Sequence, residues 1–227
     1  MMGDPEAQSS LDIQLFTGGA FAENTYLVRC TRSGRAVIVD PGAAAPQLLS
    51  HVEEQGIQVD AVYLTHAHLD HVEGLPHVME ALQVPVHLHP ADRPLYDRAA
   101  DQATAFGLRL HGDLPAIDHQ IQVGTHLPVG ETEVAVRFAP GHAPGHVIFV
   151  HEGDGIVLVG DVVFAGSIGR TDLPGGDMQQ LLASIRREIL TLPDHTRLLP
   201  GHGPETTVGQ ERIGNPFLAG QEPGASA

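Results

Sequence analysis

The amino-acid sequence predicts an α/β protein in which two β-sheets pack together and helices cover their outer faces. Short apolar runs alternate with segments of helical periodicity along the chain. Several strands followed by a helix occur twice, in residues 12–90 and again in residues 133–200. The 26 glycines and 17 prolines cluster at short turns between the apolar runs, which suits a fold with many tight connections.

The first half of the chain contains predicted strands and three predicted helices. Short apolar runs predict strands at residues 12–16, 25–30, 36–39, 61–64 and 86–88. Helical spacing of apolar residues predicts helices at residues 44–55, 72–83 and 91–106. Pro46 near the start of the first helix and Gly56 just after its end are typical of helix boundaries.

The second half repeats this pattern after a less decisive stretch at residues 108–123. Strands are predicted at residues 133–138, 147–151, 156–159 and 197–199. The sequence Glu-Gly-Asp-Gly at residues 152–155 predicts a hairpin between the second and third of these strands. Asp177 is the expected N-cap of a helix at residues 177–190, whose apolar face comprises Leu181, Leu182, Ile185 and Ile189. Residues 214–227 are expected to form a tail.

The composition does not divide the chain into parts. No linker, low-complexity segment or shift in composition interrupts the 227 residues. A chain of this length buries roughly 70–75% of its extended surface on folding, so it needs no disulfide or metal to stabilise a core. We therefore expect one domain over residues 1–227, with residues 1–10 and 219–227 frayed.

The charge balance excludes several classes of partner. The chain has 12 lysines and arginines against 28 aspartates and glutamates, a net charge of −16 with neutral histidines. Such a charge repels phosphate backbones and anionic membranes, so we expect no nucleic-acid or membrane partner. A small-molecule substrate is the expected partner, and the sequence leaves the oligomeric state open.

Cysteine usage and the amino terminus bear on the compartment. Cys30 is the single cysteine, so no disulfide forms within the chain, which fits a reducing compartment. Residues 1–10 contain no basic region followed by an apolar core, and no apolar run approaches the roughly 18 residues of a membrane span. We therefore expect a cytoplasmic protein.

Histidine is the outlier of the composition, with 15 copies. Residues 65–71 read Thr-His-Ala-His-Leu-Asp-His and follow the predicted strand at residues 61–64. His142, Asp161 and His202 each follow another predicted strand, and each is preceded by a glycine that lets the backbone turn sharply. Ligand sites of α/β folds lie beyond the carboxyl ends of strands, so these segments are expected to converge. Scattered surface histidines are the alternative, and the clustered pattern disfavours it.

The number of ligands indicates two metal ions. Five imidazoles and two carboxylates are too many for one four-coordinate ion, and Asp161 is able to bridge two ions. Nitrogen and oxygen donors without a thiolate favour zinc, while iron or manganese suits the same ligands. Two divalent ions would lower the pKa of a shared water to near 7 and so generate a hydroxide nucleophile. The sequence thus predicts metal-assisted hydrolysis by the residues His66, His68, Asp70, His71, His142, Asp161 and His202.

Other candidates are weaker than this set. His146 is expected to contact the ligands rather than to be one, because the ligand positions are already filled. Asp40 ends a strand that points to the same rim and either hydrogen-bonds a ligand histidine or forms a turn. His87 and His89 share one face of a strand but have no third ligand nearby.

These motifs resemble the metallo-β-lactamase superfamily, through His-x-His-x-Asp-His at residues 66–71, Pro-Gly-His at 140–142, Gly-Asp at 160–161 and Gly-His at 201–202. The likeness covers nearly the whole chain and is greatest to short bacterial glyoxalase II-like hydrolases, through residues 140–146, 168–177 and 200–204. It implies a four-layer αββα sandwich of two mixed sheets. It further implies that one metal is bound by His66, His68 and His142 and the other by Asp70, His71 and His202, with Asp161 between them.

The resemblance also implies a substrate and two catalytic carboxylates, Asp70 and Asp161. Glyoxalase II-like enzymes hydrolyse the thioester of S-lactoylglutathione or a related 2-hydroxyacyl thiol. This chain has Pro204 where glyoxalase II has tyrosine, and it ends before a helical extension with basic residues for glutathione. Arg170 stands where the family places a basic residue over the substrate, so it is expected to contact an anionic group of the substrate. An ion pair with Asp172 is the alternative.

Alternative activities remain open from the sequence. A lactonase or another ester hydrolase would use the same residues, and so would a β-lactamase, although β-lactamases usually lack an aspartate like Asp161. A persulfide dioxygenase, which uses one iron, would need only His66, His142 and Asp161. That family usually has Phe-Gln where this chain has Leu173-Pro174.

Overall fold

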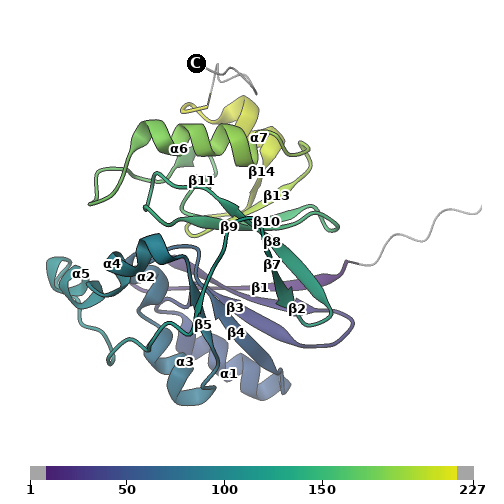
Figure 1. The fold of residues 1–227 in the computed structure, drawn as a ribbon. Helices are drawn as coiled ribbons and strands as arrows, with labels where there is room; N and C mark the ends of the chain where they lie inside the picture. The colour runs from purple at the N-terminus through teal and green to yellow at the C-terminus, as the bar shows by residue number, and fades with distance from the viewer. Residues whose placement is uncertain (1–8, 219–227) are drawn as a thin grey trace, which may run out of the picture.

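The computed structural model describes residues 9–218, and these residues form two mixed sheets that face each other (Figure 1). The first sheet has the strand order β1 (Leu11–Gly18), β2 (Glu23–Cys30), β3 (Ala36–Val39), β4 (Val59–Tyr63), β5 (Val86–Leu88) and β6 (His119–Gln120). The second has the order β14 (Thr206–Thr207), β13 (Arg197–Pro200), β10 (Ile156–Gly160), β9 (Val147–His151), β8 (Thr132–Phe138) and β7 (His126–Val129). A short hairpin joins β11 (Val163–Phe164) to β12 (Ser167–Ile168).

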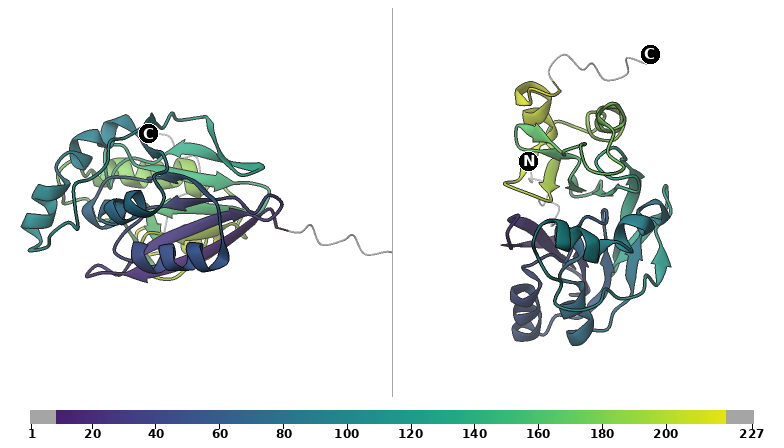
Figure 2. Two further views of the ribbon diagram at one scale, coloured as in Figure 1. Left: turned by 90° about the horizontal axis from the view of Figure 1, so that it is seen from below. Right: turned by 90° about the vertical axis from the view of Figure 1, so that its left-hand side faces the viewer.

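Helices cover the outer face of each sheet. The first sheet carries α1 (Ala45–Gln55), α2 (Leu69–Val72), α3 (Leu75–Ala81), the 3-10 turn η1 (Pro90–Asp92), α4 (Arg93–Tyr96) and α5 (Ala99–Ala105). The second carries α6 (Met178–Ser184), which continues as a π-helical turn η2 (Ile185–Ile189), and α7 (Val208–Gly214). Figure 2 shows the two halves stacked, the first in purple and blue and the second in green and yellow. The αββα sandwich is confirmed.

Three apolar clusters hold these layers together. Tyr63 and Phe149 lie between the two sheets, with ring centroids 5.9 Å apart. Leu48 and Leu75 pack the helices α1 and α3 on the first sheet. The predicted face of α6 packs on the second sheet, with Leu181, Ile185 and Ile189 fully buried and Leu182 partly buried.

Strand direction brings four connections to one edge of the sandwich. β3, β4 and β5 run parallel, and β10 runs parallel to β13. β8 and β10 are each antiparallel to β9, so they share a direction. Backbone hydrogen bonds tie these connections together. One joins the two sheets, from the Val147 N–H to the Thr65 carbonyl (2.9 Å), and another lies within the second sheet, from the Gly201 N–H to the Gly160 carbonyl (2.9 Å).

Some predicted elements differ in extent from the observed ones. The predicted helix at residues 72–83 begins only at Leu75, because the Gly74 N–H donates to the Pro41 carbonyl (2.8 Å). The predicted helix at residues 91–106 is interrupted at Arg98. There the Leu95 carbonyl accepts from the Arg98 N–H (3.1 Å) and from the Gln102 side chain (2.9 Å).

Several short elements were not predicted at all, namely β6, β7, β11, β12, β14 and α7. The helix α7 ends at Gly214, the first residue of the expected tail, and has Thr207 as its N-cap. The expected fraying of residues 1–10 and 219–227 falls mostly outside the described residues. Ser9 and Ser10, which are described, hydrogen-bond to the Asp154 carboxylate.

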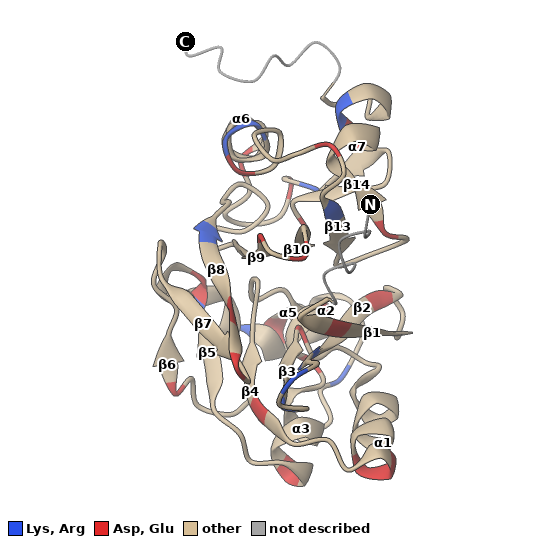
Figure 3. Cartoon of the chain, turned by 90° about the vertical axis from the view of Figure 1, so that its right-hand side faces the viewer, with Lys and Arg blue, Asp and Glu red and all other residues tan. Residues whose placement is uncertain are grey.

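Two surface properties relate to the expected partners. Asp and Glu residues, red in Figure 3, lie on both halves of the molecule and outnumber the blue Lys and Arg residues. Among residues 9–218, no helix is both long and apolar enough to cross a membrane.

Candidate metal centre

The turn after β4 carries four of the predicted ligands, and Asp40 at the end of β3 holds this turn in place. One Asp40 carboxylate oxygen accepts a hydrogen bond from the Thr65 N–H (2.7 Å), and the other accepts from the Thr65 hydroxyl (2.6 Å). Asp40 itself has a φ of 51°, in the left-handed region that aspartate tolerates better than most residues. The turn then enters the short helix α2, with His68 as its N-cap.

His142, Asp161 and His202 follow β8, β10 and β13 and approach this turn from the second sheet. The glycines before the two histidines are required by close packing. At Gly141, where φ is 132°, a side chain would collide with the backbone of Leu181. At Gly201 a side chain would collide with the Asp161 carboxylate. The structure therefore brings all seven predicted residues to one place, as the sequence predicts.

The first group of potential ligands is His66, His68 and His142, whose nitrogens lie within 4.8 Å of one another. All three side chains are buried. Nδ1 of His68 and Nε2 of His142 face each other at 2.7 Å. Nε2 of His66 is buried without a hydrogen-bond partner. Three imidazoles converging in this way are a typical arrangement for a divalent transition metal.

The second group is Asp70, His71 and His202, and it meets the first group at Asp161. Nε2 of His202 lies 3.2 Å from Oδ2 of Asp70. Asp161 places Oδ1 3.3 Å from Nε2 of His71 and Oδ2 3.3 Å from Nε2 of His142. Its Oδ2 also lies 3.5 Å from Nε2 of His202. The Asp161 carboxylate thus contacts both groups, which is the position of a bridging ligand.

Hydrogen bonds on the far side of each ring fix the orientation of four imidazoles. Nδ1 of His71 donates to Asp40 (3.1 Å), Nδ1 of His142 to the Arg170 carbonyl (2.7 Å), and Nδ1 of His202 to the Phe21 carbonyl (3.1 Å). Nδ1 of His66 lies 3.0 Å from the Thr65 hydroxyl, whose proton already goes to Asp40. This network assigns the proton of each neutral ring to Nδ1 and leaves Nε2 directed at the centre.

His146 contacts two of the predicted ligands, Asp161 and His66. Its Nε2 accepts a hydrogen bond from the Asp161 N–H (3.0 Å). Its ring stacks on His66 with centroids 4.7 Å apart. His146 therefore contacts one residue that follows a strand of each sheet, His66 of the first and Asp161 of the second.

Burial and charge divide the histidines into two kinds. Burial lowers the pKa of His66, His68 and His142, and that of His68 falls to about 3. These rings are therefore neutral. Burial also opposes protonation of His71 and His202, but the neighbouring carboxylates outweigh it and raise the pKa of both.

Asp161 shows the opposite balance. Burial raises the pKa of its carboxyl group, while the charge of His71, whose Nε2 lies 3.3 Å away, lowers the pKa more strongly, so Asp161 is ionised. In the metal-free protein, protons on His71 and His202 compensate the carboxylates. A divalent cation would displace these protons.

The donor set fits two divalent metal ions. Buried atoms without a hydrogen-bond partner include Nε2 of His66, Nε2 of His71 and Oδ1 of Asp161, and all three lie where the groups meet. Cys30, the only cysteine, lies in the core between the sheets and takes no part. The arrangement of nitrogen and oxygen donors supports two ions and leaves their identity unresolved.

A cavity of about 300 Å³ opens onto these residues. Phe21, Phe106 and Phe164 form much of its apolar wall, and Arg170 lies at its edge. The Arg170 guanidinium makes two hydrogen bonds to the exposed Asp172 carboxylate, at 2.7 and 2.8 Å. The structure therefore shows the Asp172 ion pair, and contact of Arg170 with a substrate stays a prediction.

Several residues that support the site were not predicted. Asn24 donates its N–H to the Gly201 carbonyl (2.8 Å) and its side-chain amide to the Pro200 carbonyl (3.0 Å), which holds the loop of His202. Glu23 is buried beside His71, with Oε1 3.9 Å from Nδ1. Neither residue is part of a sequence pattern that marks it as functional.

Asp92 is a third unpredicted support. Its carboxylate accepts from the Ala67 N–H (3.0 Å) and the Gly145 N–H (2.5 Å), and so it ties the turn after β4 to the loop after β8. Burial raises the pKa of Asp92 to about 6, although these two hydrogen bonds oppose the shift.

A separate histidine group lies on the outer side of the first sheet. His77 and Glu80 of α3 lie with His111 within 4.8 Å of one another, measured between ligand atoms. The rings of His77 and His111 stack with centroids 3.9 Å apart. His111 and Glu80 are exposed and His77 is partly buried.

Curated proteins of similar sequence include metal-dependent hydrolases. The chain is 37% identical over 202 residues to the "Probable metallo-hydrolase YqgX" of Bacillus subtilis, covering 89% of this chain and 95% of YqgX. It is 35% identical over 215 residues to the "Hydroxyacylglutathione hydrolase GloC" of Haemophilus influenzae, covering 92% of this chain and 98% of GloC.

Solved structures share both the fold and the approximate length. BLEG-1, a B3 metallo-beta-lactamase, superposes with a TM-score of 0.85 at 37% identity and covers 92% of this chain and 100% of its own. TTHA1623, solved in a di-iron-bound form, has a TM-score of 0.83 at 43% identity and covers 90% of this chain and 100% of its own. The family model of the metallo-beta-lactamase superfamily matches residues 18–202, which span both ligand groups. By its fold, its ligand motifs and this match, the chain belongs to the metallo-beta-lactamase superfamily.

Proposed function

We propose that this chain hydrolyses the thioester bond of a 2-hydroxyacyl thiol such as S-lactoylglutathione. Membership of the superfamily and similarity to YqgX support a metal-dependent hydrolase. The thioester class rests on the similarity to GloC, a hydroxyacylglutathione hydrolase. The observation that carries the proposal is the contact of the Asp161 carboxylate with both ligand groups, which suits two ions acting on one bond.

In this proposal the two groups bind one ion each and Asp161 bridges them. The first ion would be held by His66, His68 and His142, and the second by Asp70, His71 and His202. The absence of a thiolate from this donor set favours zinc. Iron is the main alternative because TTHA1623 was solved in a di-iron-bound form, and manganese also accepts these donors.

The chain's own residues would hold the cations and fix the orientation of the histidine rings. When bound, two divalent cations would supply Lewis acidity to the thioester carbonyl and would make a water molecule more acidic. Asp70 and Asp161 are the catalytic carboxylates, and their lowered pKa values keep them ionised and able to hold this charge. Asp40 and the carbonyls of Arg170 and Phe21 fix the histidine rings, so little reorganisation is needed during the reaction.

The leaving group explains why no further acid is needed. A thiolate departs without prior protonation more readily than an alkoxide or an amine, because thiols have a pKa near 8.5. We therefore assign the chemistry of hydrolysis to the metal ligands alone.

Arg170 is the proposed contact for a substrate carboxylate. It lies at the edge of the cavity, and its partner Asp172 is exposed, so the ion pair is open to exchange with an anionic substrate. Arg170→Ala is expected to weaken kcat/KM for S-lactoylglutathione by roughly 1.5–3 kcal/mol, and to change hydrolysis of a small neutral thioester little. Equal losses on both substrates would instead assign Arg170 to holding its loop.

The test is an activity panel on protein of known metal content. The protein is purified without added metal, its content is measured, and portions are loaded with zinc, iron or manganese. S-lactoylglutathione, a neutral thioester, a lactone, a β-lactam and glutathione persulfide are then compared by kcat/KM. We expect the thioesters to react fastest. Oxidation of the persulfide by protein that contains one iron would overturn the proposal in favour of a dioxygenase.

A β-lactam is included because BLEG-1 gives a specific reason to test it. This chain and BLEG-1 are 37% identical and share one fold. β-Lactam hydrolysis is the second candidate function. A kcat/KM for the β-lactam above that for every thioester would make it the primary activity.

The compartment and the binding partner of the enzyme are also part of this proposal. A single cysteine suits a reducing compartment such as the cytoplasm. The net charge of −16 disfavours nucleic acid and anionic membrane surfaces as partners, which leaves a small-molecule thioester as the proposed one. Separation of cell lysate into cytoplasmic and membrane fractions tests the first of these statements.

A further inference from the structure

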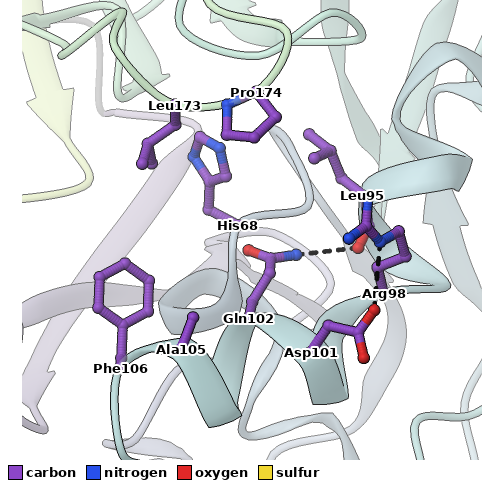
Figure 4. A pocket seen from close by; sticks show the side chains of 9 residues that line it. All are labelled: His68, Leu95, Arg98, Asp101, Gln102, Ala105, Phe106, Leu173 and Pro174. Carbon is purple, nitrogen blue, oxygen red and sulfur yellow. Dashed lines mark hydrogen bonds and ion pairs between the residues drawn. The ribbon is translucent and has the colours of Figure 1, made fainter.

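A second cavity, with a volume of about 210 Å³, lies directly beside the metal centre (Figure 4). We call it the apolar pocket. Its apolar walls are Leu95 of α4, Ala105 and Phe106 at the end of α5, and Leu173 and Pro174 from the opposite loop. Figure 4 shows Leu173 and Pro174 on one side of the pocket and Phe106 and Ala105 on another, with His68 between them. The pocket therefore starts at one of the proposed ligands.

The polar side chains of the pocket already have partners. The Gln102 oxygen accepts from the Leu69 N–H (3.1 Å), and its amide nitrogen donates to the carbonyls of Leu95 (2.9 Å) and Ala67 (3.3 Å). The Arg98 guanidinium pairs with the Asp101 carboxylate at 3.2 Å. A bound group would gain mainly apolar contact here, because the Gln102 amide is already hydrogen-bonded and five of the nine lining residues are apolar.

The apolar pocket and the metal cavity adjoin each other. His68, Gln102, Phe106 and Leu173 line both of them. Phe106 is 45% exposed although its ring contacts Phe21, with centroids 5.1 Å apart. Covering this ring and its apolar neighbours would release ordered water and is favourable. A substrate bound at the metal centre would lie next to Phe106 and its apolar neighbours, so one of its substituents could cover them.

We propose that the apolar pocket binds an apolar side chain of the substrate's acyl group, an inference that rests on the proposed function. In another protein, an apolar cavity of about 150 Å³ is large enough to bind benzene. The apolar pocket therefore accommodates a phenyl ring or an alkyl chain of about four to six carbons. The preferred substrates are then 2-hydroxyacyl thioesters with a larger apolar substituent than the methyl group of lactate.

The acyl side is favoured over the thiol side by charge. Glutathione is polar and anionic, whereas most of the residues that line the apolar pocket are apolar and its one cation, Arg98, lies beside the Asp101 carboxylate. Arg170 lies in the metal cavity and not among the residues that line the apolar pocket. An anionic thiol is therefore better placed along the metal cavity, which leaves the apolar pocket for the acyl substituent.

The first experiment varies the acyl chain on one thiol. The metal-loaded enzyme is assayed with glutathione thioesters of lactate, 2-hydroxybutyrate, 2-hydroxyhexanoate and mandelate. Burial of one methylene in an apolar site corresponds to about a fourfold gain in kcat/KM, so the value is expected to rise along the alkyl series and to be high for mandelate. A parallel series of alkyl thiol esters of lactate varies the other side of the bond.

A pair of variants locates the effect. Ala105→Phe fills the apolar pocket and is expected to reduce the ratio of kcat/KM for 2-hydroxyhexanoyl over lactoyl thioester to about one. Ala100→Phe is the matched control, because Ala100 lies on the same helix, is exposed, and lines a different part of the surface. This control is expected to keep the wild-type ratio.

The outcomes separate the two proposals. Hydrolysis of the lactoyl thioester without any rise along the acyl series would overturn the apolar pocket as an acyl site and leave the proposed function intact. A rise confined to the alkyl thiol series would overturn the assignment to the acyl side. Failure to hydrolyse any thioester would overturn the proposed function, and with it the inference.

Discussion

Two groups of histidines in this molecule differ in one respect that decides whether they form a site. The buried group after β4, β8 and β13 and the outer group of His77, Glu80 and His111 both place three or more ligand atoms within 4.8 Å. In the buried group, His66, His71, His142 and His202 each have Nδ1 fixed by a hydroxyl, a carboxylate or a carbonyl.

The outer group has no such support among the described residues. His77 and His111 stack on each other, and the nearest charged group is Glu80, whose Oε2 lies 3.5 Å from Nε2 of His111. Ligand atoms therefore lie close together in both groups. Only in the buried group do hydrogen bonds to Nδ1 direct the Nε2 lone pairs toward one point. Partners that orient a ligand typically change metal affinity or activity by 10–100-fold, so we expect the buried group alone to bind metal tightly.

The largest effect is expected at Asp161, because its carboxylate joins the two halves of the buried group. Asp161→Asn preserves the size of the side chain and removes its charge. Metal affinity or kcat should fall at least tenfold, measured by metal content after dialysis and by thioester hydrolysis. Near-normal activity with both metals retained would show that Asp161 does not bridge.

A smaller but still large effect is expected at Asp40, which orients His71 without reaching the centre. Asp40→Asn removes the charge that accepts from both His71 and Thr65. Affinity for the second metal is expected to fall about tenfold, measured by competition with a chelator. Asp60→Asn on β4 is the matched control, because Asp60 pairs with the exposed Arg35 and should leave the affinity unchanged. Equal affinities for the two variants would remove orientation as the difference between the histidine groups.

Asp92 gives a pH-dependent test of how the turns of the buried group are held. Its carboxyl pKa is about 6 in the folded protein and near 3.9 in an unfolded chain. Between these values the folded state keeps a proton that the unfolded state has lost, so this group's contribution to the free energy of unfolding falls as the pH rises from about 4 to 6. Two pKa units correspond to about 3 kcal/mol.

The measurement compares the wild type with Asp92→Asn, which cannot titrate at this position. Denaturant unfolding of both proteins is followed from pH 4 to 7 in the same chelator-containing buffer. The stability of the wild type relative to the variant is expected to decrease with rising pH. An increase would show that the hydrogen bonds from Ala67 and Gly145 outweigh burial and keep Asp92 ionised.

The smallest effect is expected in the outer group. His77→Ala removes one of its two imidazoles, which the structure does not orient. Metal content and kcat/KM should match those of the wild type, whereas His71→Ala should lose metal. A loss of one metal equivalent in His77→Ala would break the comparison, because an unsupported group would then hold an ion.

The comparison also shows what the sequence makes predictable. The convergence of candidate ligands that follow strands directly, such as His66 and Asp161, is predictable because the motif and the strand end coincide in the chain. The partners that orient them come from distant segments. Asn24 and Asp92 contact the metal loops only after the two sheets pack, and nothing in their local sequence indicates these contacts.

Helices and strands also differ in how far local sequence predicts them. The long helix at residues 45–55 and the buried strands have strong periodicity, so their positions follow from local sequence. The break at Arg98 depends on a side chain from the next turn, and β6 pairs through only two residues. Such features are fixed by tertiary contacts and therefore escape a prediction from periodicity.

The central claim is that the two ligand groups joined by Asp161 form one centre for two metal ions. The most direct measurement is the metal content of the active enzyme by elemental analysis after gentle loading, together with its activity at each step of loading. We predict that content approaches two equivalents per chain and that activity requires the second. A stable plateau at one equivalent in a fully active enzyme would contradict the claim.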